Sequence, residues 1–258
     1  MNISFENKNI IIMGVANKRS IAWGIAEVLH KAGANLIFTY GKERSKKNIE
    51  KLVETLENQN HLILPCDVTD DEAIHQTFNT IKEKVGIIHG VAHSVAFANK
   101  EELEGEFVDT SREGFLLAQN VSAYSLTAIA REARPLMTEG GSIVTISYLG
   151  GERVVRNYNV MGVAKASLEA SVMYLANDLG KDDIRVNAIS AGPLRTLSAK
   201  GVSDFNSVVK VIEERSPLRR SITLEEVGNT ALFLFSELST AITGEVLHVD
   251  SGYHTIGI

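Results

Sequence analysis

A tyrosine and a lysine at helical spacing are the residues of this sequence best suited to chemistry. Tyr158 and Lys165 lie seven positions apart, and two turns of an α-helix take about 7.2 residues, so a helix would place both side chains on one face. A tyrosine hydroxyl can donate a hydrogen bond to a developing oxyanion, and a nearby ammonium makes that donation easier by lowering the pKa of the phenol. The same ammonium can hold a ribose hydroxyl. Such pairs are common and usually structural, so the place of this pair in the chain decides between the two interpretations.

The surrounding sequence alternates short β-branched runs with longer helical patterns. Strands are predicted at 9–13, 35–40, 61–65, 88–94, 142–147, 185–190 and 245–250. Helices are predicted at 21–32, 44–58, 70–85, 111–137, 157–179, 207–214 and 224–236. This alternation predicts an α/β fold, a Rossmann-like doubly wound sheet of seven parallel strands in one domain spanning residues 1–258. The helix that carries Tyr158 then follows the fifth strand, beside the carboxyl ends where such sheets bind ligands.

The turn after the first predicted strand suits a phosphate group, although it lacks the G-x-G-x-x-G pattern. Gly14 is followed five residues later by Ser20, and three residues further on by Gly24. Ser20 can cap the helix that begins at Ile21 and bond a phosphate, while Gly24 permits close packing of helix on strand. Ile21 is a further predicted cofactor contact. Taken alone, the segment is an ordinary strand-to-helix turn. Its position after the first strand favours nucleotide binding.

Two later strand ends offer further cofactor contacts. Asp67 follows the third strand and can accept a hydrogen bond from an adenine amino group, with the Val68 N–H as a second contact. An aspartate in this place is more often a turn or capping residue. Ser94 and Val95 end the fourth strand with small side chains, which would let a nicotinamide ribose approach the backbone. Tight core packing would favour the same residue types.

Composition and charge limit the partners. Twenty-six basic and thirty-two acidic residues give the 258-residue chain a net charge of -6, which argues against nucleic acid and acidic membrane surfaces. A single cysteine, Cys66, excludes an internal disulfide and a cysteine-based metal cluster. No leader-like segment and no run of eighteen apolar residues is present, so a cytoplasmic protein is expected. No metal site is predicted, because six of the seven histidines are dispersed without ligand-like pairing: His61, His75, His89, His93, His248 and His254.

Several segments together resemble the short-chain dehydrogenase/reductase superfamily, and within it the bacterial enoyl-acyl-carrier-protein reductases. The resemblance is carried by residues 14–25, 111–120, 145–165, 185–200 and 248–254, which lie in the same order along nearly the whole chain. Most members of the superfamily place three residues between the tyrosine and the lysine, with a serine upstream. Here six residues separate them, and Tyr148 stands where that serine would be. This departure is typical of the enoyl reductases.

The resemblance implies a reaction and residue roles. Hydride would pass from the nicotinamide to C3 of a trans-2-enoyl thioester on acyl carrier protein, Tyr158 would stabilise the enolate oxygen, and Lys165 would hold the ribose. Tyr148 would contact the thioester or shape the pocket. A homotetramer built on the two long helices and the C-terminal segment is also implied, with a lid over the acyl chain at about residues 192–215. Further implied contacts are Leu194 and Thr196 on the cofactor and Ala98, Ser198 and Phe205 on the substrate.

The cofactor preference is predicted from the residues after the second strand. Relatives that use NADPH carry two adjacent basic residues at the positions of Gly41 and Lys42, whereas this chain has only the second. Relatives with small residues there use NADH. We therefore expect NADH and NADPH both to work, with NADPH slightly favoured through Lys42 and with Arg44 as a second candidate. A solvated charge run at the start of a helix is the alternative.

Two other functions stay open. The first is a 3-oxoacyl thioester (carbonyl) reductase of the same superfamily with Tyr158 as the acid, against which the tyrosine-to-lysine spacing argues. The second is a nucleotide-binding sensor without turnover, against which the complete set of Tyr148, Tyr158 and Lys165 argues.

Overall fold

Seven parallel strands form the central sheet of the computed structural model, which describes residues 3–56, 61–196 and 205–256. Their order across the sheet is β3-β2-β1-β4-β5-β6-β7. Because β1 and β4 are neighbours while the chain winds outward on both sides of them, the predicted doubly wound fold is confirmed. The strands are β1 (Asn9–Met13), β2 (Asn35–Tyr40), β3 (Leu62–Pro65), β4 (Gly90–His93), β5 (Gly141–Ser147), β6 (Ile184–Ala191) and β7 (Val246–Val249).

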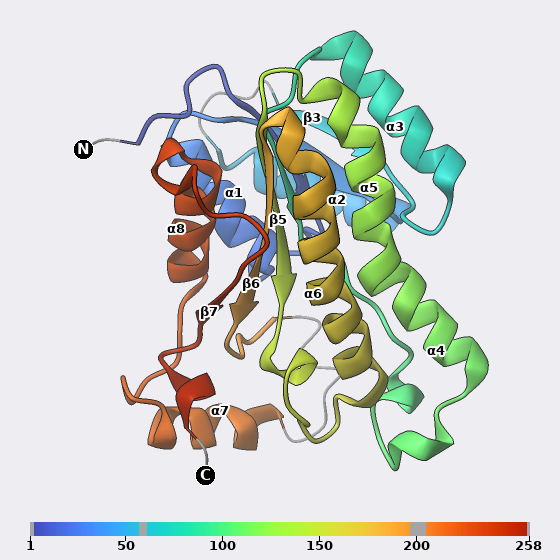
Figure 1. Cartoon of the computed structure of the whole chain (residues 1–258), viewed down its shortest axis with the longest axis vertical. Coiled ribbons are helices and arrows are strands. Elements are labelled where there is room, and N and C mark those ends of the chain that lie inside the picture. The colour runs from blue at the N-terminus through green and yellow to red at the C-terminus, as the bar shows by residue number, and fades with distance from the viewer. Residues whose placement is uncertain (1–2, 57–60, 197–204, 257–258) are drawn as a thin grey trace.

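Helices cover both faces of this sheet (Figure 1). One face carries α1 (Ile21–Lys31), α2 (Glu43–Val53) and α8 (Leu224–Phe235), and the other carries α3 (Asp71–Lys84), α5 (Ser125–Ala133) and α6 (Asn159–Leu179). Helix α7 (Phe205–Arg215) lies across the end to which β5 and β6 point (Figure 1). In the described parts of the chain, no helix is long and apolar enough to cross a membrane.

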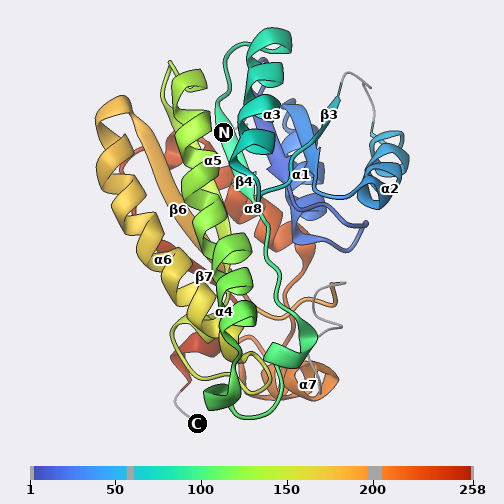
Figure 2. The same cartoon turned by 90° about the vertical axis from the view of Figure 1, so that its right-hand side faces the viewer.

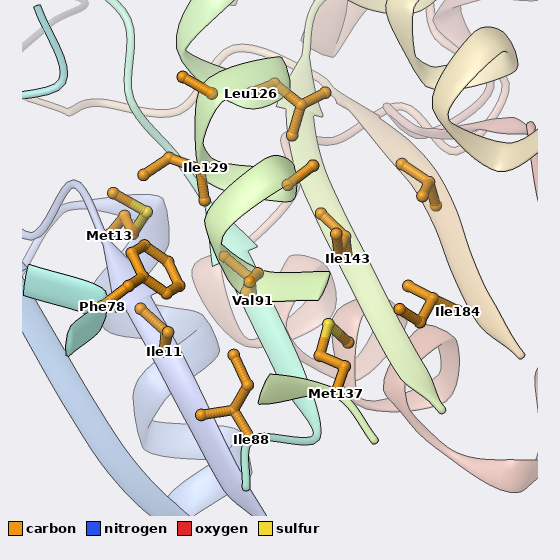
Figure 3. Packing of buried hydrophobic residues seen from close by; sticks show 14 of the residues in the cluster. Ile11, Met13, Phe78, Ile88, Val91, Leu126, Ile129, Met137, Ile143 and Ile184 are labelled. Atoms are coloured by element: carbon orange, nitrogen blue, oxygen red, sulfur yellow. The ribbon is translucent and has the colours of Figure 1, made fainter. Parts of the chain in front are cut away.

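Strand β1 shows why the central strands read as continuous apolar runs. Ile10 and Ile12 join the buried cluster beneath α1 and α8, whereas Ile11 and Met13 join the cluster beneath α3 and α5. A strand buried on both faces needs apolar side chains at every position. Figure 3 shows Ile11 beside residues of neighbouring strands in the second cluster. Burying each such side chain contributes about 2 kcal/mol, so the strand ends that carry the site rest on a rigid base.

The helix predicted at 111–137 is interrupted in the structure. α4 (Arg112–Gln119) and α5 are joined by a π-helical turn at Asn120–Tyr124, and α4 continues along the line of α5 beside α6 (Figure 2). Within this turn the Ser122 hydroxyl accepts a hydrogen bond from the Phe97 N–H at 3.0 Å and donates one to the Phe97 carbonyl at 3.1 Å. The turn thereby anchors the segment that follows β4. A run of helix-forming residues carries no local signal for such a turn.

Helices α1 and α8 cross at two glycines. A Cβ atom added at Gly24 would lie 2.7 Å from the Leu224 Cβ, and one added at Gly228 would lie 2.7 Å from the Gly24 carbonyl oxygen. The predicted role of Gly24 in helix-to-strand packing is therefore wrong, because its close contact is with another helix. A reciprocal capping box between Thr223 and Glu226 fixes the start of α8 at this crossing.

Candidate functional site

The predicted cofactor residues follow the ends of neighbouring parallel strands and lie along one edge of the sheet. Met13 pairs with His93 in the register of β1 and β4, so Gly14 and Ser94 follow these strands at the same level. The other strand ends place more predicted residues on this edge: Lys42 after β2, Asp67 after β3, Tyr148 after β5 and Leu194 after β6. Open parallel sheets bind ligands beyond this edge, where the strand order reverses between β1 and β4.

Gly14 brings the first turn directly against the end of β4. Its φ of +94° lies in the region that favours glycine, and a Cβ atom there would overlap the Ser94 carbonyl oxygen. A pyrophosphate needs backbone rather than side chains next to it, so this turn fits the phosphates of a dinucleotide.

The Ser20 hydroxyl supports the turn instead of capping the helix. Ser20 has the extended backbone of an N-cap residue, yet its buried Oγ accepts hydrogen bonds from the N–H groups of Ala16 and Asn17, both at 3.0 Å. The predicted cap is therefore wrong, because the preceding turn curls back over the hydroxyl. Ile21 begins α1 as expected. The contacts of Ser20 with a phosphate and of Ile21 with the cofactor stay predictions.

The structural alternatives are visible at Asp67, Val68 and Val95. The exposed Asp67 accepts hydrogen bonds at Oδ1 from the Thr69 N–H at 3.0 Å and the Thr69 hydroxyl at 2.7 Å, as a turn residue does. The side chains of Val68 and Val95 pack against the core, which leaves their backbone groups for a ligand. The adenine and ribose contacts stay predictions.

Two tyrosine rings meet beyond the end of β5. Tyr148 directly follows β5 and Tyr158 directly precedes α6, and their rings pack edge to face with centroids 4.9 Å apart and planes at 70°. Gly150 makes room for the second ring, because a Cβ atom there would overlap Tyr158. Asn157, with a φ of +60°, turns the chain into the helix. The sequence pattern had predicted Tyr158 inside a helix over residues 157–179. In the structure Tyr158 is instead the N-cap residue of α6.

Lys165 lies inside α6 as a buried ammonium with a polar support. Its side chain is 5% exposed, and Nζ donates a hydrogen bond to the Ile146 carbonyl oxygen at 2.7 Å. Burial lowers the pKa of Lys165 to about 8, against the opposing effect of Glu169 one turn later. The residue is therefore mainly charged at neutral pH although it is buried.

A buried histidine lies behind this lysine. His93, the last residue of β4, hydrogen-bonds the hydroxyls of Thr145 and Ser125 through its two ring nitrogens, each at 2.9 Å. Burial, and then the nearby Lys165, lowers the pKa of His93 to about 3. His93 is therefore neutral at neutral pH and adds no charge next to the lysine.

Both tyrosine hydroxyls are neutral donors. Burial raises the pKa of Tyr148 to about 12, and the pKa of Tyr158 is raised by burial first and then by Tyr148 and Glu169. The predicted lowering of the Tyr158 pKa by Lys165 is wrong for this structure, because burial of the hydroxyl dominates. Each hydroxyl therefore holds its proton at neutral pH and can donate it in a hydrogen bond.

A small apolar cluster lies beside Tyr158 and Ala98, on the predicted substrate side. Ala98 and Tyr158 pack against a small buried cluster made of Leu103, Ala118, Val160, Met161 and Ala164. On the cofactor side, Leu194 packs against the core, and the Thr196 N–H donates a hydrogen bond to the Leu194 carbonyl at 2.7 Å. Of the other predicted contacts, Ser198 lies outside the described residues, and Phe205 is placed only as the first residue of α7.

The candidate 2′-phosphate residues lie at the start of α2. Lys42 is its exposed N-cap residue and Arg44 is exposed in its first turn. Lys46 differs from them, because it pairs with Glu43 at 3.6 Å and Glu50 at 4.0 Å. Lys42 and Arg44 are thus the first two basic side chains after β2, and both are exposed.

Sequence reasoning missed a carboxylate beside the lysine. Glu169 lies one turn after Lys165 on α6, is half-buried, and accepts a hydrogen bond from the Ser147 hydroxyl at the end of β5. The four-residue spacing from Lys165 was the signal that could have found it.

Sequence reasoning also missed a chain of histidines and acids near this carboxylate. Glu152 lies 2.6 Å from the His248 Nε2, the rings of His248 and His254 stack with centroids 4.0 Å apart, and His254 bonds Asp250 at 3.0 Å. The prediction of dispersed histidines is therefore wrong for this pair.

Comparison with known proteins agrees with this geometry. The family model described as Enoyl-(Acyl carrier protein) reductase matches residues 14–254. The enoyl-acyl-carrier-protein reductase (NADH) FabI of Bacillus cereus is 69% identical over 98% of both chains, and the NADPH-named FabI of Staphylococcus aureus is 61% identical over 98% of this chain and 99% of its own. A crystal structure of the B. cereus enoyl-acyl carrier protein reductase with NADP+ and indole naphthyridinone covers 100% of both chains at 68% identity, with a TM-score of 0.98. The chain therefore belongs to the enoyl-acyl-carrier-protein reductase family of the short-chain dehydrogenase/reductase superfamily.

Proposed function

We propose that Tyr158, Lys165 and Tyr148 carry out the reduction of a trans-2-enoyl thioester on acyl carrier protein to the saturated acyl thioester. As a member of its family, the chain is an NAD(P)H-dependent enoyl reductase of type II fatty acid synthesis. When bound, the nicotinamide cofactor supplies the hydride that adds to C3. The observation that carries the residue assignment is the Tyr148–Tyr158 pair at the sheet edge, at the start of the helix that carries the buried Lys165.

Each side chain has a separate task in this scheme. Tyr158 donates a hydrogen bond to the thioester oxygen as negative charge develops there, which its raised pKa permits at neutral pH. Lys165 binds the ribose hydroxyls and places a positive charge beside the enolate. A proton then adds to C2 and balances the hydride at C3. Tyr148 contacts the thioester or holds the Tyr158 ring in its orientation through their edge-to-face contact.

A substrate comparison tests this function. The protein is mixed with reduced cofactor and either crotonyl or acetoacetyl thioester, and the absorbance of the reduced cofactor is followed. We expect oxidation with the crotonyl thioester and little with the acetoacetyl thioester. The opposite preference would favour the carbonyl reductase, which the family comparison already disfavours, and inactivity with both would indicate a sensor.

Lys42 is proposed to favour NADPH over NADH by pairing with the 2′-phosphate. Lys42→Ala should lower kcat/KM for NADPH about fivefold and leave the value for NADH unchanged, because an exposed ion pair contributes up to about 1 kcal/mol. Steady-state kinetics with both cofactors measure the ratio. Lys47→Ala removes the same charge from an exposed position on the same helix and should change neither value.

Two outcomes would contradict this assignment. If the wild-type protein had a higher kcat/KM with NADH than with NADPH, the predicted preference for NADPH would be wrong. An unchanged NADPH-to-NADH ratio in Lys42→Ala would instead reject the named contact, and Arg44→Ala would then test the second candidate.

The lid at about residues 192–215 is a proposal that rests on its position. Leu194 and Thr196 lead into this segment from β6. Helix α7, which forms its second half, lies across the end to which β5 and β6 point (Figure 1). Closure over an acyl chain would exclude water from the enolate. Residues 197–204 lie outside the described part of the chain.

A cytoplasmic homotetramer is also proposed. Exposed apolar side chains on the helix face support the assembly, since Leu116, Met173 and Tyr174 are 59%, 56% and 75% exposed. The half-exposed residues of edge strand β7 offer a second contact near the C-terminal segment. The free, buried Cys66 fits a reducing compartment.

A further inference from the structure

Glu169 is held at the meeting point of three elements behind the catalytic site. It lies on α6, accepts a hydrogen bond from Ser147 at the end of β5, and borders the Leu149–Gly151 turn. A Cβ atom added at Gly151 would lie 2.9 Å from the Glu169 Oε1. The carboxylate is thus fixed in place beside the segment that carries Tyr148.

Of the groups around the Lys165 ammonium, those on β5 and β4 are neutral and the one on α6 is acidic. From β5 the ammonium meets the neutral Ile146 carbonyl at 2.7 Å. From β4 it faces His93, which is neutral at neutral and alkaline pH. On α6, Glu169 follows one turn after Lys165, and the two side chains hydrogen-bond adjacent residues of β5, Ser147 and Ile146. Its negative charge favours the protonated form of Lys165.

The groups that face Glu169 set when it is ionised. Burial is the largest influence and raises its pKa above the ordinary value, whereas the Ser147 hydrogen bond lowers it. Glu152, from the turn after β5, raises this pKa further, and His248 from β7 and Lys165 lower it.

We propose that Glu169 is a positioning residue for the reduction, whose carboxylate keeps Lys165 protonated on the alkaline side of neutrality. The inference rests on the role proposed above for Lys165 in holding the ribose and the charge beside the enolate. Glu169 touches neither substrate nor cofactor in this scheme. It acts through Lys165, because it sets the pH range over which that lysine stays charged and can bind the ribose.

The test is the pH profile of Glu169→Gln, which keeps the size of the side chain and removes its charge. Loss of a nearby unit charge moves a pKa by about one unit or more, so kcat/KM should be near wild type at pH 6.5 and roughly tenfold lower at pH 9. The Kd of the reduced cofactor, followed by its fluorescence, should rise over the same pH range. Glu169→Asp keeps the charge and should restore most of the alkaline activity.

A control on the same helix separates local from general charge effects. Asp178 is exposed on α6 and lies thirteen residues after Lys165, about 20 Å along the helix axis. Asp178→Asn removes one negative charge from this distance and should leave the profile unchanged.

Two results would overturn the role of Glu169, and a third would overturn the role of Lys165. An unmoved alkaline limb in a folded Glu169→Gln protein overturns the role of Glu169. An equal loss at pH 6.5 and pH 9 shows a packing role through Ser147 and also overturns it. If the alkaline limb persists in Lys165→Met, the role of Lys165 itself fails, which is a different outcome from a failure of Glu169 alone.

Discussion

Replacing Tyr158 with phenylalanine should lower kcat for enoyl reduction by roughly 10²- to 10³-fold, the usual cost of removing one oxyanion donor. The Kd of the reduced cofactor should stay within about twofold of wild type, because the substitution removes only a hydroxyl. The ring remains able to pack on Tyr148 and into the space left by Gly150. Single-turnover kinetics with a crotonyl thioester measure the chemical step directly.

Tyr148→Phe is the matched control for this experiment. It removes a hydroxyl from the other ring of the same pair and should reduce turnover much less. If Tyr158→Phe kept wild-type single-turnover rates, or if Tyr148→Phe were the more damaging change, the donor would have been assigned to the wrong ring.

Replacing Lys165 with methionine should weaken both cofactor binding and turnover. We expect the Kd of the reduced cofactor to rise about tenfold and kcat/KM to fall by roughly 10²-fold or more, because a charge-assisted donor to the ribose and the charge near the enolate are both lost. Titration by cofactor fluorescence and steady-state kinetics measure the two effects.

A structural cost accompanies this substitution and has to be measured separately. The Ile146 carbonyl loses its 2.7 Å hydrogen-bond donor, and an unsatisfied buried carbonyl costs about 1–3 kcal/mol. Thermal unfolding should therefore show a lower Tm. A folded Lys165→Met protein with wild-type cofactor affinity would contradict the ribose contact, whatever its Tm.

The sheet could be predicted because its determinants are local. The apolar run of β1 and the glycine after it predict a buried strand and a tight turn, and both occur at the expected residues: Asn9–Met13 and Gly14. Tyr158 and Lys165 could be found from their spacing and from their place after the fifth strand. The strand order then brought their elements to the ligand-binding edge.

The features that were missed depend on neighbours distant in the sequence. The Ser20 hydroxyl is occupied by the turn before it, and the close partner of Gly24 belongs to the last helix. The raised pKa of Tyr158 follows from burial, which a helical spacing does not report. The contact between Glu169 and Ser147 needs the packing of α6 on β5. No periodic pattern along the chain encodes such pairings.

The crossing of α1 and α8 has a consequence for how the protein matures. Gly24 and Gly228 are in contact across 204 positions of sequence, so the first βα unit acquires its last neighbour only when the chain is almost complete. Translation at about 5–20 residues per second separates the two glycines by roughly 10–40 s on the ribosome. Throughout this time the apolar side of α1 that contacts α8 is uncovered. We therefore expect the nascent chain to bind chaperones until α8 emerges, and premature termination before Thr223 to yield aggregating fragments rather than a smaller folded domain.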